Sequence, residues 1–80
     1  MNVSYYVVVP VDRNEEGDLT AGDAQEAIGA LSAERGARTL AIEHAGAVAF
    51  SRTGDPSVGE FQDAVILAQF GEVDLNTLGE

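Results

Sequence analysis

The sequence predicts an α+β domain in which two helices cover one face of an antiparallel sheet, and three observations support this. Eighty residues are enough for one domain. Several short segments alternate apolar and polar residues with the period of a strand, and two longer segments repeat apolar residues at helical spacing. The expected order is β-α-β-β-α, with a candidate final strand that would make the arrangement ferredoxin-like.

The first half of the chain is expected to form a strand, an acidic loop and a helix. Residues 3–11 are rich in Val and Tyr and predict the strand, and residues 12–18 form the loop. Thr20 has the chemistry of a helix N-cap, with Asp23 three residues later as its capping-box partner. Apolar residues then recur at helical spacing at Ala24, Ala27, Ile28 and Leu31, and Gly36 is expected to end the helix.

The second half is expected to form a hairpin followed by a second helix. Residues 38–44 alternate, and after a turn at Ala45 and Gly46 a second alternating run places Val48 and Phe50 on one face. Ser57 and Glu60 have capping-box spacing, and Gly71 is expected to end the helix that they begin. Its inward stripe would be Val58, Phe61, Ala64, Val65 and Ala68, and the final strand would contain Val73 and Leu75.

The charge of the chain is its most unusual property. Fourteen Asp and Glu residues face four Arg and no Lys, which gives a net charge of −10. Such a field repels nucleic acids and anionic membranes and attracts basic surfaces. The chain has no Cys for a disulfide or a thiolate metal site, no signal-peptide pattern at its start, and no apolar run near the roughly 20 residues of a membrane span.

The residues needed for common catalytic sites are missing. Without Cys or Lys, the chain has no thiol nucleophile, Schiff-base amine or P-loop lysine. Gly17 and Gly22 have P-loop spacing, but Asp23 follows where the lysine is required. His44 could meet Ser51 across the predicted hairpin, yet no nucleophile elbow accompanies them, and a surface histidine is the simpler interpretation. We therefore expect a protein that binds a partner and is not an enzyme.

Residues 12–23 read DRNEEGDLTAGD and match the spacing of an EF-hand calcium loop. Gly17 occupies the sixth position, where the loop turns sharply, and Asp23 occupies the last, which resembles the loops of dockerin modules. The match departs from these families because a strand precedes the loop, Glu16 is longer than the usual fifth ligand, and no second loop follows. Two interpretations stay open, a Ca²⁺ site and an acidic turn before a helix cap. The candidate ligands are Asp12, Asn14, Glu16, Asp18 and Asp23.

Carboxylates along the loop and the two predicted helices are candidates for binding a basic partner. Carboxylates three residues apart on a helix lie about 5–6 Å apart, so two helices and the loop could imitate a track of phosphates at coarser density. The favourable helix dipole, salt adaptation and solubility are alternative explanations for these charges. The candidate partner-binding residues are Asp12, Glu15, Glu16, Asp18, Asp23, Glu26, Glu60 and Asp63.

Three apolar residues fall outside the inward stripe of the second predicted helix. Ile66, Leu67 and Phe70 lie near or between polar positions, which indicates an interface of a homodimer. Alternatively, the chain end covers them through Leu75 and Leu78. Both a monomer and a homodimer are compatible with the sequence.

The chain resembles the small acidic anti-CRISPR proteins of phages and mobile elements, in particular inhibitors of type I systems. The resemblance rests on size, absence of Cys, the α+β order, missing enzyme motifs and the eight carboxylates above. It implies an inhibitor in the cytoplasm of a host bacterium that covers the nucleic-acid-binding site of a CRISPR effector complex without binding nucleic acid itself. A small calcium-binding module and a salt-adapted structural or interaction domain are the alternatives.

Overall fold

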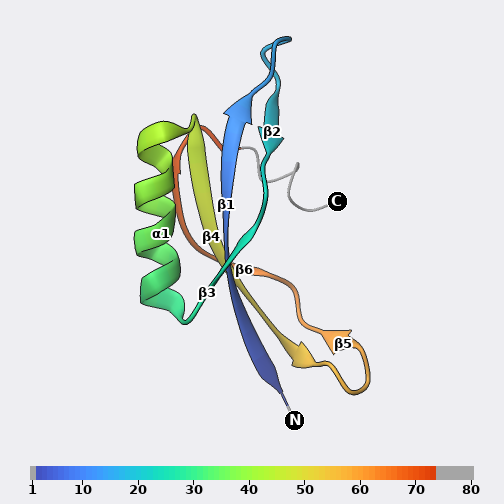
Figure 1. Ribbon diagram of the computed structural model, residues 1–80. Coiled ribbons are helices and arrows are strands. Elements are labelled where there is room, and N and C mark those ends of the chain that lie inside the picture. Colours follow the sequence, from blue (N-terminus) through green and yellow to red (C-terminus); the bar gives the residue numbers. More distant parts are fainter. Residues whose placement is uncertain (1, 74–80) are drawn as a thin grey trace.

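Two long antiparallel strands form the centre of the fold in a computed structural model that describes residues 2–73 (Figure 1). β1 (Val3–Arg13) pairs with β4 (Gly46–Asp55) through nine residue pairs. Val-rich sequence favours the extended backbone of β1, and its alternating side chains point to the two faces of the sheet. The predicted strand at residues 3–11 is confirmed, and Val48 and Phe50 lie in β4 as expected.

Each central strand is bordered by an interrupted edge strand. β2 (Leu19–Ala21) and β3 (Gln25–Ala27) both pair with the outer edge of β1. β5 (Glu60–Phe61) and β6 (Val65–Gly71) both pair with the outer edge of β4. All these pairings are antiparallel, so the six strands form one sheet whose two edges each consist of two short pieces.

One helix covers one face of this sheet. α1 (Ala30–Glu43) connects β3 to β4 and packs against β1, β3, β4 and β6 (Figure 1). Small residues let its backbone approach the strands closely, because Ala33 and Ala37 are fully buried. Within residues 2–73, no helix has the length and apolar character that crossing a membrane requires. The core consists of Val8, Ala33, Ala37, Ala47 and Ala49, with Tyr6, Ala27, Leu40, Ala41, Leu67, Ala68 and Phe70 packed around it.

The α+β class and the antiparallel sheet are confirmed, but the two helices and the ferredoxin-like arrangement are wrong. The first predicted helix began at Thr20, whereas the structure places Thr20 in β2 and starts α1 at Ala30. The segment 38–44, predicted as a strand, lies mostly in α1. Its alternation is too short to distinguish the period of a strand from that of a helix. The strong helix formers around it favour the helix.

The second predicted helix, residues 57–71, is also wrong. Ser57 belongs to the turn after β4, where its backbone N–H and its hydroxyl donate to Asp55 Oδ1 at 3.0 and 2.6 Å. Residues 65–71 form β6 because their apolar side chains can pack against β4 and α1 in an extended strand as well as on a helix. Val73 lies in no strand, and Leu75 and Leu78 lie outside the described residues.

Gly36 distinguishes the two placements of the helix experimentally. It lies in the middle of α1, and a Cβ added there would make an ordinary contact with Val8 Cγ2 at 3.4 Å. Because glycine is unfavourable inside a helix, Gly36→Ala should raise the free energy of unfolding by about 0.5–1 kcal/mol. Urea denaturation followed by circular dichroism measures this change. A loss of stability would instead indicate the helix end that the sequence predicts at this position.

Candidate anionic binding surface

The eight predicted partner-binding carboxylates lie in separate parts of the molecule. One group occupies the β1–β2 hairpin, and a second follows along β2 and β3. Glu60 and Asp63 lie at and after β5, at the opposite end of the sheet from the hairpin (Figure 1). The expected rows on two helices are wrong, and the helix dipole explains neither Asp23 nor Glu60, because neither lies in a helix.

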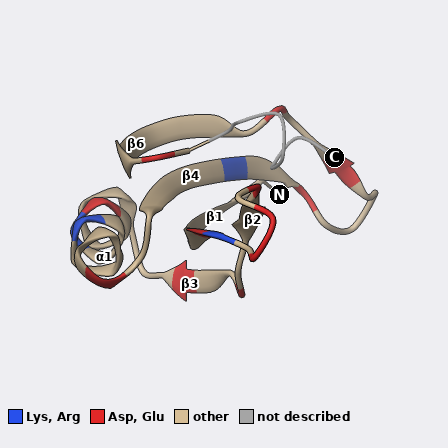
Figure 2. Ribbon diagram, turned by 90° about the horizontal axis from the view of Figure 1, so that it is seen from above, with Lys and Arg blue, Asp and Glu red and all other residues tan. Residues whose placement is uncertain are grey.

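Five exposed carboxylates follow one border of the molecule. They lie at the tip of the β1–β2 hairpin and along the β2–β3 edge of the sheet, which carries red segments in Figure 2. No basic residue occurs between positions 14 and 34. At about 3.3 Å per residue, the extended stretch from residue 18 to residue 26 spans roughly 26 Å. We call this set the anionic edge: Glu15, Glu16, Asp18, Asp23 and Glu26.

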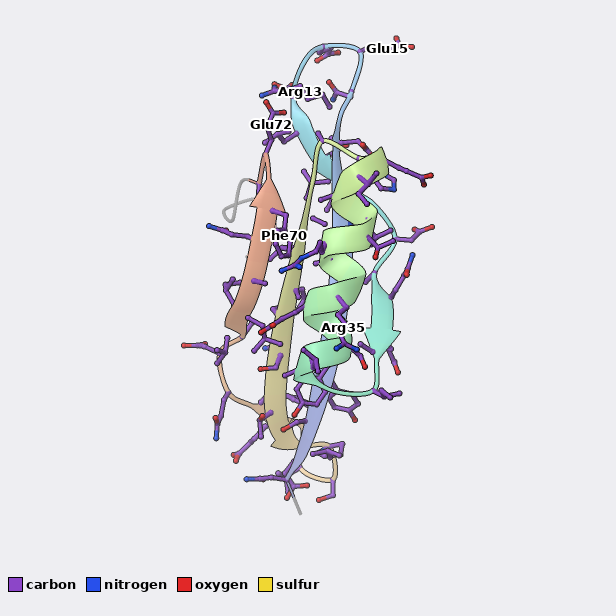
Figure 3. The ribbon with its side chains drawn as sticks, turned by 90° about the vertical axis from the view of Figure 1, so that its left-hand side faces the viewer. Arg13, Glu15, Arg35, Phe70 and Glu72 are labelled. Carbon is purple, nitrogen blue, oxygen red and sulfur yellow. The ribbon has the colours of Figure 1, made fainter. Side chains whose placement is uncertain are left out.

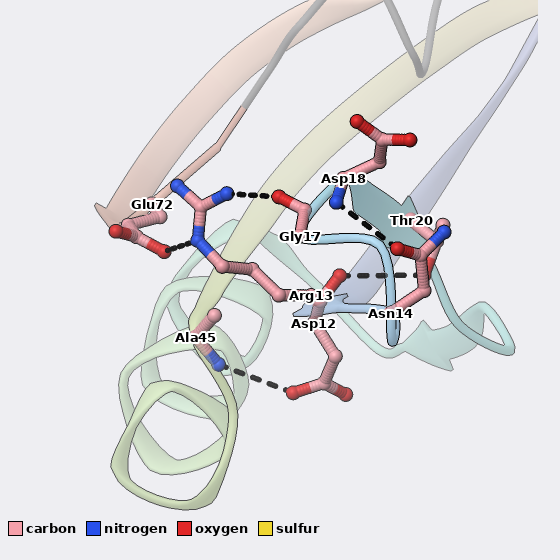
Figure 4. Close-up of polar contacts among 8 residues, drawn as sticks. All are labelled: Asp12, Arg13, Asn14, Gly17, Asp18, Thr20, Ala45 and Glu72. Carbon is pink, nitrogen blue, oxygen red and sulfur yellow. Dashed lines mark hydrogen bonds and ion pairs between the residues drawn. The ribbon is translucent and has the colours of Figure 1, made fainter.

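Hydrogen bonds of Asn14 fix the backbone of the hairpin tip. Asn14 Oδ1 accepts from the Asp18 N–H at 3.0 Å (Figure 4) and from the Glu16 N–H at 2.9 Å. The Asn14 N–H donates to the Asp18 carbonyl at 2.9 Å. Gly17 has a φ of 85°, a conformation that glycine adopts without strain. The turn is therefore defined by local bonds that leave the Glu15 side chain at the tip (Figure 3).

Arg13 connects the hairpin to the end of β6. Its Nε donates to Glu72 Oε2 at 2.9 Å, and its Nη1 donates to the Gly17 carbonyl (Figure 4). Both side chains are about half exposed, so this ion pair contributes little to stability. The Arg13 guanidinium pairs with Glu72, which is not one of the five carboxylates of the anionic edge.

Asp12 has a structural role that the sequence does not reveal. Its Oδ2 lies 2.6 Å from His44 Nδ1, and its Oδ1 accepts the Ala45 N–H at 3.2 Å. The hydrogen bond to His44 lowers the pKa of Asp12, and the Ala45 bond adds to this effect against the cost of desolvation. Asp12 therefore ties β1 to the connection between α1 and β4. The partner lies 32 residues away, which no local spacing could indicate.

The described residues do not bring the predicted calcium ligands together around one point. The loop 12–23 is a β-hairpin in which the Asp12 carboxylate faces His44 and the Asn14 carbonyl oxygen accepts backbone N–H groups. An EF-hand loop instead directs its ligands toward one ion. Across residues 2–73, no three His, Asp or Glu side chains come together in a way that could hold a metal ion. The set Asp12, Asn14, Glu16, Asp18 and Asp23 is thus not gathered.

The predicted apolar interface is largely used inside the fold. Leu67 and Phe70 are partly buried and pack against the core. The Arg38 guanidinium lies 5.5 Å from the centre of the Phe70 ring, which faces α1 in Figure 3. Ile66 remains 41% exposed because it points to the face of the sheet that α1 does not cover. Only Ile66 of the three is therefore free for a partner.

Comparisons with known proteins identify no relative of the chain. No family model matches the chain, and neither a curated protein nor a solved structure is significantly similar to it.

Replacing Asp12 tests its contact with His44 through the pH dependence of stability. Because the pKa of Asp12 is lower in the folded state, its carboxylate stabilises the fold above the unfolded pKa of about 3.9, and this contribution is lost as the pH falls through the folded value. Asp12→Asn should therefore melt below the wild type at pH 7, and the gap should narrow as the pH falls from about 3.9 through the folded pKa of Asp12.

Asp18→Asn is the matched control, since it removes the same charge from the hairpin tip without touching His44. Thermal melts of the three proteins between these pH values measure the effect. A gap between wild type and Asp12→Asn that is as large at the lowest pH as at pH 7 would rule out the ionised contact.

Proposed function

We propose that the chain is a non-enzymatic inhibitor whose anionic edge docks on a basic, nucleic-acid-binding surface of another protein. The observation that carries this proposal is the run of exposed carboxylates along the edge. Five exposed carboxylates follow the hairpin tip and the β2–β3 border, and no arginine lies among them in the sequence. Such a border attracts a cationic groove and repels nucleic acid itself.

The shape of the hairpin supports the same role. The sheet and its two hairpins extend the molecule to 42 Å in its longest dimension and 16 Å in its shortest, so the acidic tip stands at the end of a narrow body (Figure 1). Its charge density is low, because the stretch of roughly 26 Å from residue 18 to residue 26 holds three carboxylates, whereas duplex DNA carries one charge per roughly 1.7 Å. The edge therefore imitates the sign and direction of a phosphate track and not its density.

The more specific form of the proposal is an anti-CRISPR protein that covers the DNA-binding surface of a type I effector complex. It is supported by the small size, the acidity and the border of carboxylates that the chain presents. The partner would then be the effector complex, with no membrane and no nucleic acid bound directly.

A salt-adapted domain without an acidic site is the second candidate. The carboxylates outside the anionic edge favour it, because Glu34, Glu43, Glu60 and Asp63 occur on other elements and on other sides of the molecule (Figure 2). In that case the net charge alone, and not its position, would determine how the protein interacts.

Charge reversal at two matched pairs of positions separates these candidates. Target-DNA binding by a type I effector complex, followed by fluorescence anisotropy, should weaken as the wild-type chain is added, and this inhibition should decline with salt. Glu15→Lys with Asp23→Lys should raise the inhibitory concentration by roughly tenfold or more. Glu60→Lys with Asp63→Lys changes the net charge by the same amount. This pair should alter the inhibitory concentration by less than about threefold.

Equal losses of inhibition in the two double variants would favour a role for net charge alone. No inhibition by the folded wild-type chain at any salt concentration would reject the type I effector complex as the partner.

A further inference from the structure

The sheet extends beyond α1 at the end where β1 begins and β4 ends (Figure 1). The two faces of this extension differ in polarity. On one face, the hydroxyl groups of Ser4 and Thr53 lie 2.8 Å apart. The other face carries a groove of about 400 Å³ with mostly apolar walls. We call this groove and its walls the aromatic face: Tyr5, Val7, Glu26, Phe50, Arg52 and Phe61.

The aromatic face is held in shape by contacts among its own residues. The rings of Tyr5 and Phe61 lie 6.0 Å apart with a tilt of 45°. The Arg52 guanidinium lies 5.7 Å from the centre of the Phe61 ring, and its Nε donates to the Gln62 carbonyl at 3.2 Å. Gly54 makes this arrangement possible, because a Cβ at that position would collide with Phe61. A surface fixed in this way loses little conformational entropy on binding.

Large apolar side chains on and beside this surface are exposed to solvent. Tyr5 and Phe61 are each 39% exposed, and Val3 beside them is 38% exposed. Large apolar side chains that gather on one exposed face are typical of a protein interface.

The charges of the aromatic face fit a second copy of the same face. Its two charged residues, Glu26 and Arg52, have opposite signs, and neither takes part in an ion pair among residues 2–73. Across a twofold axis, each contact between two different residues occurs twice. Glu26 of one copy can therefore pair with Arg52 of the other at both ends of a symmetric interface.

We propose that the aromatic face is the interface of a symmetric homodimer, formed around Tyr5 and Phe61 and closed by reciprocal Glu26–Arg52 pairs. A neutral face is where two chains of charge −10 can meet with the least repulsion. The dimer engages only Glu26 of the anionic edge and leaves its other four carboxylates exposed. Because salt screens the repulsion between the two chains, dimerisation strengthens as salt rises, which is the opposite of docking on a basic protein.

Analytical ultracentrifugation of the full chain tests this inference independently of the proposed inhibition. At millimolar protein and high salt, the average mass should approach twice the monomer's 8.4 kDa, and it should fall at low salt. Phe61→Asp should restore the monomer. Ile42→Asp introduces the same charge at a residue of α1 that is 80% exposed, and it should leave the dimer intact.

Exchanging the two charges tests the geometry of the pairing. Glu26→Arg and Arg52→Glu alone should each weaken dimerisation roughly tenfold, and the double exchange should restore at least part of the loss. Circular dichroism confirms that each variant is folded. A wild type that stays monomeric at high salt would overturn the inference. So would a dimer that survives Phe61→Asp, since the contact would then lie elsewhere, such as at the outer edge of β6.

Discussion

The pairing of β1 with β4 is the constraint on which the rest of the structure depends. Among the described residues, every side chain of the buried apolar core except those of Ala33 and Ala37 belongs to one of these two strands. The helix packs across them, and both edges of the sheet are built on their outer sides. Because the core is made largely of Val and Ala, it is thin, and the close approach of α1 to the strands replaces the bulk that larger side chains would provide.

The chain has a thin core and a net charge of −10, so its charged side chains must stay at the periphery. No polar or charged side chain is buried among the described residues. The carboxylates instead occupy turns, edges and the exposed side of α1, and Asp12 is used to hold β1 to the end of the helix. This distribution gives the molecule two surfaces with opposite character. The proposed docking of the anionic edge on a basic partner weakens with salt, and the proposed self-association through the aromatic face strengthens with salt.

The long run of β-branched residues predicted its strand correctly, whereas short local patterns failed, among them the capping-box spacings at Thr20 and Ser57. The long Val-rich run of β1 fits only a strand, whereas residues 38–44 and 57–71 carry apolar residues that suit either period. Their conformations are decided by where α1 and β4 lie, which local sequence does not contain. The same limit applies to the site. The acidity of residues 12–26 was evident, but the contact of Asp12 with His44 and the groove beside Phe61 join residues far apart in the chain.

Native-state hydrogen exchange is the most direct test of the central strand pair. Amides in the middle of β1 and β4, around Val9 and Val48, should exchange most slowly, since opening them requires unfolding of the whole domain. Amides of β2, β3 and β5 should exchange faster because these edge strands are short. Slow exchange across residues 57–64 with the pattern of a continuous helix, or β4 amides no better protected than those of β5, would contradict this account.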